Sequence, residues 1–173
     1  MKKLLITTLT ISGYLFSSAQ DSLHSVRYEN LKEVSFPSRI DSAEAKGVKV
    51  FYSNTSDLLF ECLIPISPDD SVTSPKKFDR RLQIFIEGFC SSEAWKYHNR
   101  EQVDTTIGSV EGKLVHGYEP SKPGQVKEFF SFFTIVNRRY YVIMLAAKIG
   151  VTSILKRKIY DVLETVKFEG KNY

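Results

Sequence analysis

The stretch Phe129–Lys148, FFSFFTIVNRRYYVIMLAAK, decides the fold class of this chain. It contains two apolar runs of eight residues, 129–136 and 140–147, separated by the residues Asn-Arg-Arg at 137–139. Eight residues is the length of a strand, whereas a helix that crosses a membrane needs about 20 apolar residues. Because Asn tolerates the left-handed backbone of a tight turn, the pattern predicts an antiparallel hairpin with its two arginines at the tip.

Both faces of this predicted hairpin are largely apolar. Along the first arm, Phe130 and Phe132 point to one face, and Phe129 and Phe133 point to the other. The second arm follows the same pattern. Strands that are apolar on both faces lie in the middle of a sheet that is covered on each side. The chain must therefore supply a layer for each face.

Two amphipathic helices are predicted to form those layers. The first begins after Ser74 as N-cap, with Pro75 at the first helical position. Its apolar face contains Phe78, Leu82, Phe85, Ile86 and Phe89. The second begins at Thr152 or Ser153 and ends near residues 168–170. Its apolar stripe contains Leu155, Ile159, Val162, Leu163 and Val166. Burying one large apolar side chain stabilises a fold by about 1.5–3 kcal/mol, so both stripes are expected to face the sheet.

Shorter strands are predicted on either side of the first helix, between Pro and Gly residues that end them. They span residues 31–36, 48–53, 57–66, 101–109 and 111–118. The chain order is then three strands, a helix, about four strands and a helix, which favours an antiparallel α+β fold. We therefore expect a single domain over residues 20–173. It is an α/β/α sandwich with a central, mainly antiparallel sheet of about six or seven strands covered by two main helices.

The N-terminal segment MKKLLITTLTISGYLFSSAQ is typical of a secretory signal peptide. Lys2 and Lys3 precede an uncharged, mostly apolar run, and Ser17 and Ala19 supply the small residues of a cleavage site. We expect cleavage after Ala19, which places the mature protein in the periplasm or outside the cell. No later segment approaches the length of a spanning helix, so the mature chain is expected to be soluble, without a transmembrane segment.

The mature chain is expected to carry little net charge. Removing residues 1–19, with two lysines and no acids, from the 173-residue chain leaves 154 residues and lowers the formal charge from +4 to +2. Binding to phosphate backbones needs a basic stripe, so we expect no nucleic-acid partner. Basic residues do cluster on both predicted helices, opposite the apolar stripes, where a solvated face is the simplest interpretation and a docking surface the alternative. These residues are Lys76, Lys77, Arg80 and Arg81, and Lys156, Arg157 and Lys158.

The layout resembles a known superfamily. The segment EVSFPSRI, the strand pair GVKVFYS and DLLFECLI, the long middle helix, the paired apolar strands and a closing helix that ends in VLETVKF carry the resemblance. They are similar to the superfamily that includes the PsbP subunit of the photosynthetic oxygen-evolving complex and the bacterial periplasmic protein DcrB. The similarity covers most of residues 28–169. It implies an α/β/α sandwich and a role as an accessory or binding protein, and no family ligand residue can be transferred because no position matches an active-site motif.

The residues that could form an enzyme site are separated along the sequence and match no catalytic motif. Cys90 can act as a nucleophile if His98 or His116 serves as its base and Asp104 orients the imidazole, although a buried helical cysteine is the commoner use. Cys62, Cys90, His98 and His116 lack the short spacing that positions zinc ligands. The sequence also lacks a Gly-x-Ser-x-Gly elbow, a phosphate loop and an HExxH helix. We therefore predict no catalytic residue, no cofactor and no metal site.

The two cysteines also raise the question of a disulfide. An exported location permits a bridge between Cys62 and Cys90. Cys62 lies in a predicted strand and Cys90 at the end of a predicted helix, and a bridge requires their Cα atoms to lie within about 7 Å. Two reduced, buried thiols are the favoured interpretation.

Trp95, Tyr97, His98 and Asn99 are the candidate partner-binding residues. They follow the first predicted helix, where a Trp and a Tyr can anchor a partner protein. The loop 119–125 can frame the same surface. The alternative is that Trp95 closes one end of the core.

These observations favour a soluble, exported binding or accessory protein that associates non-covalently with an unknown protein of the cell envelope. A periplasmic inhibitor, an immunity protein or a chaperone-like protein would share these features. A carrier of a small apolar ligand held between sheet and helix is the second class of function, and a Cys-dependent hydrolase is the third.

Overall fold

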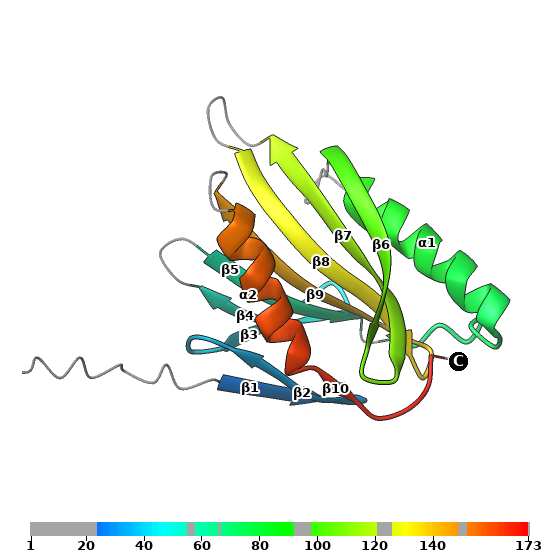
Figure 1. The fold of residues 1–173 in the computed structure, drawn as a ribbon. Coiled ribbons are helices and arrows are strands. Elements are labelled where there is room, and N and C mark those ends of the chain that lie inside the picture. The colour runs from blue at the N-terminus through cyan, green and yellow to red at the C-terminus, as the bar shows by residue number, and fades with distance from the viewer. Residues whose placement is uncertain are drawn as a thin grey trace, which may run out of the picture.

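A seven-stranded antiparallel sheet lies at the centre of the protein (Figure 1). The computed structural model describes residues 24–54, 58–65, 67–91, 98–120, 126–148 and 152–172, so the predicted signal peptide lies outside the described residues. In chain order the elements are β1 (His24–Tyr28), β2 (Leu31–Phe36), β3 (Asp41–Ala45), β4 (Val48–Asn54), β5 (Leu58–Pro65), α1 (Pro75–Ser91), β6 (His98–Ile107), β7 (Val110–Pro120), β8 (Val126–Val136), β9 (Arg139–Lys148), α2 (Thr152–Glu164) and β10 (Lys167–Phe168). Of the helices described, neither is long and apolar enough to cross a membrane.

The strands of the main sheet follow the order β3-β4-β5-β9-β8-β7-β6, and all neighbours are antiparallel. β8 and β9 form the predicted hairpin, in uninterrupted register up to the pair Val136 and Arg139. The turn consists of Asn137 and Arg138, with φ angles of 46° and 66°. Positive φ at both positions is typical of the type I′ turn, whose twist matches that of the strands. The predicted hairpin is confirmed, with a shorter turn, because Arg139 already belongs to β9.

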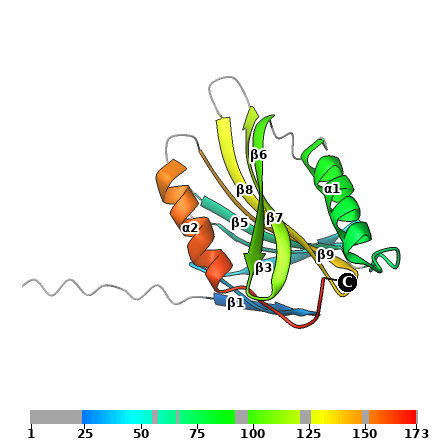
Figure 2. The same cartoon turned by 45° about the vertical axis from the view of Figure 1, so that its right-hand side comes forward.

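The helices α1 and α2 cover opposite faces of the main sheet (Figure 2). Phe129 and Phe133 of β8 belong to one core cluster together with Leu82 of α1. The intervening Phe130 belongs to the other cluster together with Ile159 of α2. The alternation of side chains along a strand therefore fills both cores at once. The predicted α+β class, and the sandwich with two covered faces, are confirmed.

A second sheet of three strands, in the order β1-β2-β10, completes the layer on the α2 side. The strand predicted at residues 31–36 is confirmed, but it belongs to this second sheet and not to the central one. Its Val34 and Phe36 are buried in the same core cluster as α2. The second helix ends earlier than predicted, at Glu164, because the chain turns at Thr165 and then extends as β10.

The sequence patterns missed β1 and β3. The five residues of β3, DSAEA, are all exposed and include none of the β-branched and aromatic side chains that mark strands. This strand is held by its pairing with β4 across a turn in which Lys46 and Gly47 both have positive φ. Backbone pairing, and not a side-chain pattern, decides this strand.

The last described residues lie beside the turn of the β8–β9 hairpin (Figure 1). Asn137 donates its backbone N–H to the carbonyl of Lys171 at 2.8 Å. The next residue, Asn172, is buried. Its Oδ1 accepts from the Glu111 N–H at 2.9 Å, and its Nδ2 donates to the carbonyls of Glu111 at 2.8 Å and Ile135 at 3.0 Å. The Asn172 amide therefore links β7 to β8 beyond the point where their backbone pairing ends.

Candidate functional site

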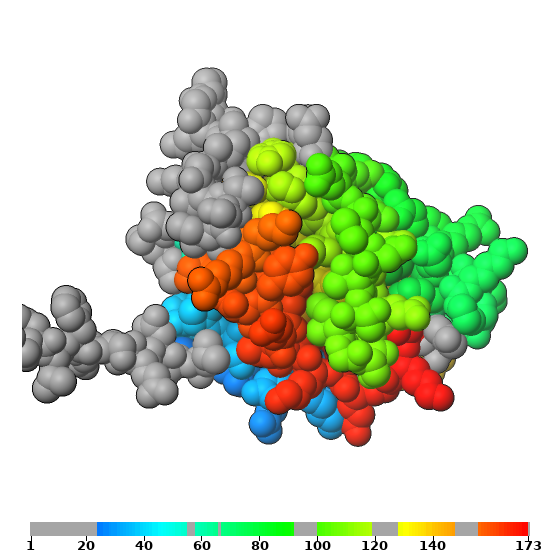
Figure 3. Space-filling model, viewed as in Figure 1, coloured from blue at the N-terminus to red at the C-terminus, as the bar shows by residue number. Residues whose placement is uncertain are grey.

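The strand β6 forms one edge of the main sheet and is exposed on both of its faces. Within the described part of the chain it pairs with β7 alone. Val103 is 61% exposed, and Glu101, Gln102, Asp104 and Thr106 are exposed as well. Figure 3 shows the yellow-green β6–β7 hairpin at the surface, between α2 and α1. This strand is therefore accessible from both sides.

The outer edge of β6 presents backbone donors and acceptors. Glu111 of β7 directs its N–H and its C=O to Asn172, on the side away from β6. Two residues paired directly across antiparallel strands either exchange both hydrogen bonds or direct both groups away from each other. Thr106 is paired with Glu111, so its own N–H and C=O point outward from the sheet. The same alternation applies to Asp104 and Gln102.

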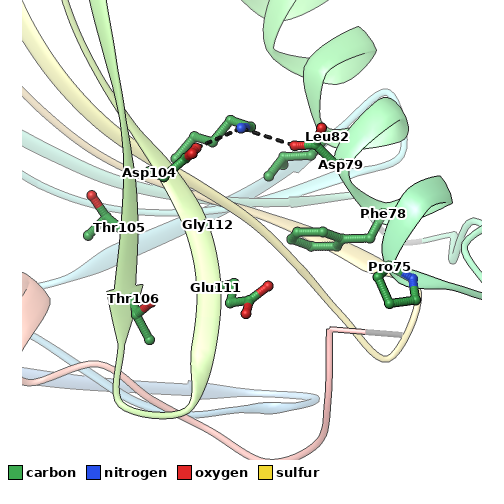
Figure 4. Close-up of a pocket in the computed structure, with 10 residues that line it drawn as sticks. Pro75, Phe78, Asp79, Leu82, Asp104, Thr105, Thr106, Glu111 and Gly112 are labelled. Atoms are coloured by element: carbon green, nitrogen blue, oxygen red, sulfur yellow. Dashed lines mark hydrogen bonds and ion pairs between the residues drawn. The ribbon is translucent and has the colours of Figure 1, made fainter.

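On one face of β6, a groove of about 420 Å³ separates the β6–β7 hairpin from the first turns of α1 (Figure 4). We call it the α1 groove. Among its lining residues are Phe78, Asp79 and Leu82 of α1 and Asp104, Glu111 and Lys113 of the hairpin. The apolar floor comes from the buried Phe78 and Leu82, which occur at helical spacing on the core-facing side of α1.

Lys113 ties the hairpin to the helix across this groove. Its Nζ lies 2.7 Å from Oδ1 of Asp104 and 3.0 Å from Oδ1 of Asp79, as the dashed lines in Figure 4 mark. Burial alone would lower the pKa of Lys113, but the hydrogen bonds to both carboxylates outweigh it and raise the pKa. With Glu111 added, three carboxylates face one ammonium among the lining residues. The α1 groove therefore keeps a formal excess of two negative charges.

Gly112 lets the hairpin lie close to β8. A Cβ atom at this position would lie 2.6 Å from ring carbons of Phe132 and would also meet the carbonyl oxygen of Phe133. No side chain fits in that space without a shift of β8. Thr105 is paired with Gly112, so its neighbour across the strands has no side chain.

On the other face of β6, a second groove of about 490 Å³ separates the tip of the hairpin from α2. We call it the α2 groove. Its lining includes Thr105, Ile107, Tyr160, Leu163, Glu164 and Val166. Tyr160 is 42% exposed although most of its surface is apolar. In contrast to the α1 groove, this one is mainly apolar.

The structure does not bring together Cys90 and His116, which were considered from the sequence as a nucleophile and its base. Cys90 is buried in the core cluster on the α1 side, where burial raises the pKa of its thiol although Arg100 lies beside it. His116 lies on the opposite face, where its ring stacks on Phe130 at 4.2 Å and its Nε2 lies 2.7 Å from Oε1 of Glu128. The main sheet separates Cys90 from His116. Within the residues that the structure describes, no group of three or more His, Cys, Asp or Glu side chains can hold a metal ion.

The other residues considered as partners of Cys90 are Asp104 and His98. Asp104 points to the α1 groove and binds Lys113. His98 begins β6, and its side chain lies outside the described residues. The nucleophile–base–acid arrangement considered from the sequence is therefore not assembled from the side chains that are described.

The two cysteines are free thiols on opposite faces of the main sheet. Cys62 belongs to the core cluster on the α2 side, and Cys90 to the cluster on the α1 side. Burial raises the pKa of Cys62 to about 12. A bridge between the two would have to pass through the sheet, so the disulfide considered from the sequence does not form in this structure, which has the two buried thiols that we favoured.

The candidate partner-binding residues fall partly outside the described residues. Trp95 and Tyr97 lie there, and so do the side chains of His98 and Asn99. The backbones of His98 and Asn99 begin β6, the strand that carries the candidate site. Their role in partner binding stays a prediction.

Sequence reasoning missed the main residues of the grooves, namely Asp79, Thr105, Thr106, Glu111 and Lys113. The available signal was the composition of β6, HNREQVDTTI, in which polar residues occur on both faces and the large apolar residues are Val103 and Ile107. A strand that is polar on both faces is typical of an uncovered edge. The grooves themselves depend on how α1, the element before β6, and α2, which follows three strands later, pack beside the sheet.

The basic clusters on the helices lie in solvent. Lys76, Lys77, Arg80 and Arg81 of α1 are exposed, as are Lys156 and Arg157 of α2, and Lys158 is half-buried. On α1, Nε of Arg81 lies 3.9 Å from Oδ2 of Asp69. This exposure agrees with the interpretation of these residues as solvated faces.

Comparisons with known proteins bear on the fold alone. No protein-family model matches the chain, and no curated protein matches it. The chain is similar to a solved crystal structure from Bacteroides thetaiotaomicron VPI-5482, with a TM-score of 0.50 and 12% sequence identity. The match covers 79% of this chain and 44% of the other, so the chain spans less than half the length of that protein. At this identity the likeness shows a shared fold.

Proposed function

We propose that this chain is an exported, non-catalytic accessory protein that binds a protein of the cell envelope, and that it does so through β6 and the α1 and α2 grooves. The observation that carries the proposal is the long edge strand that both grooves flank. Membership of the superfamily of PsbP and DcrB, whose members act mostly as accessory or binding proteins, is part of the same proposal.

The two edges of the main sheet support this choice of surface. The edge strand β3 has five residues, and natural sheets often protect their edges by keeping such strands short. The edge strand β6 has ten residues, includes no Pro, and has the exposed apolar Val103 at its centre. A long, accessible edge strand is a template for pairing with another chain and lowers solubility when it stays uncovered. A partner that covers β6 would remove this cost.

A photo-crosslinking amino acid placed at Val103, and in a second variant at Tyr160 of the α2 groove, tests the proposal in cells of the native host. We expect a discrete covalent adduct with one envelope protein, identified by mass spectrometry. The matched control carries the same amino acid at Ser42, an exposed position on the opposite edge strand β3. Adducts of equal yield and identity at Val103 and Ser42, or none at Val103 and at Tyr160, would contradict the proposal.

A further inference from the structure

We infer that the partner contributes an extended segment that pairs with the outer edge of β6 as an additional strand, with basic side chains in the α1 groove and apolar side chains in the α2 groove. This inference rests on the proposed function and gives it a binding mode and a partner chemistry.

The backbone of β6 supports strand addition. Gln102, Asp104 and Thr106 direct their N–H and C=O groups outward, at every second residue. An added strand satisfies these groups through main-chain hydrogen bonds, which supply affinity without depending on the partner's sequence. Its side chains then alternate between the two faces of the sheet and supply the specificity.

The face toward α1 selects a basic side chain. Side chains of even-numbered β6 residues lie on this face, as the ion pair of Asp104 with Lys113 and the hydrogen bond from Gln102 to Gln83 of α1 show. A partner residue opposite Asp104 or Thr106 would enter the same face and meet Asp79, Asp104 and Glu111. The formal excess of two negative charges in the α1 groove favours Lys or Arg there.

The face toward α2 selects an apolar side chain. Thr105 and Ile107 lie on this face, and Ile107 packs against the core cluster of α2. A partner residue opposite Thr105 would lie over Tyr160 and Leu163 in the α2 groove. Because adjacent residues of a strand point to opposite faces, the recognised segment alternates basic and apolar residues.

A second copy of this chain fits the two grooves less well. On the face toward α1, β6 itself would offer Arg100, Gln102, Asp104 and Thr106, which carry no net positive charge. On the other face its only large apolar side chains are Val103 and Ile107. The charge of the α1 groove therefore favours a foreign segment.

Hydrogen exchange measured by NMR tests this binding mode, using the mature chain and a synthetic peptide of alternating lysine and valine. We expect exchange of the Gln102, Asp104 and Thr106 amides to slow by about tenfold when the peptide is present at about ten times its Kd. The Val103 and Thr105 amides face β7 in both states and should change little. A peptide of alternating glutamate and valine should leave all these amides unchanged.

Three variants separate the contribution of the main-chain hydrogen bonds to peptide binding from that of the charge in the α1 groove. Thr106→Pro removes an outward N–H without touching the bonds to β7 and should abolish the protection by the peptide. Ser42→Pro makes the same change on the edge strand β3 and should leave the protection intact. Asp104→Asn should weaken peptide binding by roughly two- to fivefold, and less so in high salt. Thermal melts of each variant verify that the fold is retained.

The outcomes discriminate between the alternatives. Protection that appears on β3, or equally on all β6 amides, would overturn strand addition, and equal binding of the glutamate peptide would overturn the charge preference. Protection that grows with protein concentration and needs no peptide would assign the edge to a second copy. If the crosslink at Val103 captures an envelope protein but the peptide fails, the inference falls and the proposed function stands. If the peptide binds and neither Val103 nor Tyr160 captures a protein, the proposed function falls instead.

Discussion

The β8–β9 and β6–β7 hairpins belong to the same sheet and have two-residue turns, yet their surroundings differ. Phe133 in β8 is fully buried and contacts the rings of Phe85 and Phe89 from α1. In β6, Val103 is mostly exposed. The contrast shows that the β8–β9 hairpin lies in the core, while the outer strand of the β6–β7 hairpin contributes little burial and is exposed.

The turns of the two hairpins also differ in their contacts with the rest of the chain. The Asn137–Arg138 turn is fastened by the backbone bond to Lys171 and by the Asn137 side chain, which donates to Asn30 at 3.0 Å. The Gly108–Ser109 turn is exposed. Contacts from distant parts of the chain therefore concentrate at the buried hairpin.

The largest effect is expected from shortening one apolar side chain in each hairpin. Phe133→Ala should lower the free energy of unfolding by about 3–5 kcal/mol, because it leaves a cavity beside α1. Val103→Ala should change it by about 0.5 kcal/mol or less, because the side chain lies in solvent. Urea unfolding followed by circular dichroism measures both. Similar losses for the two variants would refute the contrast between the hairpins.

A smaller loss is expected at the amide that joins the two hairpins. Asn172→Ala leaves the N–H of Glu111 without its partner, while the C=O of Glu111 still accepts from the Thr134 hydroxyl, and should cost about 1–3 kcal/mol. The neighbouring Lys171→Ala keeps the backbone bond to Asn137 and removes an exposed side chain. It is the matched control and should be nearly neutral. Equal stabilities of the two variants would show that Asn172 does not fasten β7 to β8.

Acid should lower the free energy of unfolding by protonating Asp69, which accepts a hydrogen bond from the β8–β9 hairpin. Tyr140 of β9 donates to Oδ2 of Asp69 at 2.6 Å, and Ser71 donates to Oδ1 from its backbone N–H at 3.0 Å. Burial alone would raise the pKa of Asp69, but these hydrogen bonds outweigh it and lower the pKa below its ordinary 3.8. The stabilisation is therefore present above pH 3.8 and is lost as the pH falls through the lower folded-state pKa.

The Asp69→Asn variant isolates this contribution. We expect it to be less stable than the natural protein by about 1 kcal/mol at pH 6, with the difference shrinking as the pH falls below the ordinary pKa of Asp69. Urea unfolding across this range of pH gives both curves. A difference that stays constant with pH would mean that the charge of Asp69 does not contribute.

The smallest effect is expected from the charges of the α1 groove. Asp104 is exposed, so Asp104→Asn should change the free energy of unfolding by about 1 kcal/mol or less. The same change should alter binding of the lysine–valine peptide, which the stability measurement does not report. A large loss of stability would instead show that the Lys113 bridge holds the hairpin to α1.

The sequence by itself determined the central hairpin, both helices and the antiparallel α+β class, because side-chain periodicity reports how many faces of an element are buried. The alternation of phenylalanines in 129–136 requires two covers, and the stripes of α1 and α2 are long enough to provide them. A strand at 101–109 was also predicted, where the structure has β6, although its place at the edge of the sheet was not inferred from its polar residues.

Only the tertiary structure decided which strands pair and which side chains meet. Side-chain periodicity does not identify the strand with which another strand pairs. The strand at 31–36 therefore could not be assigned to the second sheet from the sequence, and β3, which has no side-chain pattern, is recognised only from its pairing with β4. The separation of Cys62 from Cys90 by the sheet, and the meeting of Asp79, Asp104 and Lys113, depend on how separate elements pack against one another. Contacts of this kind are set by the burial of the whole chain, and no local stretch of residues contains them.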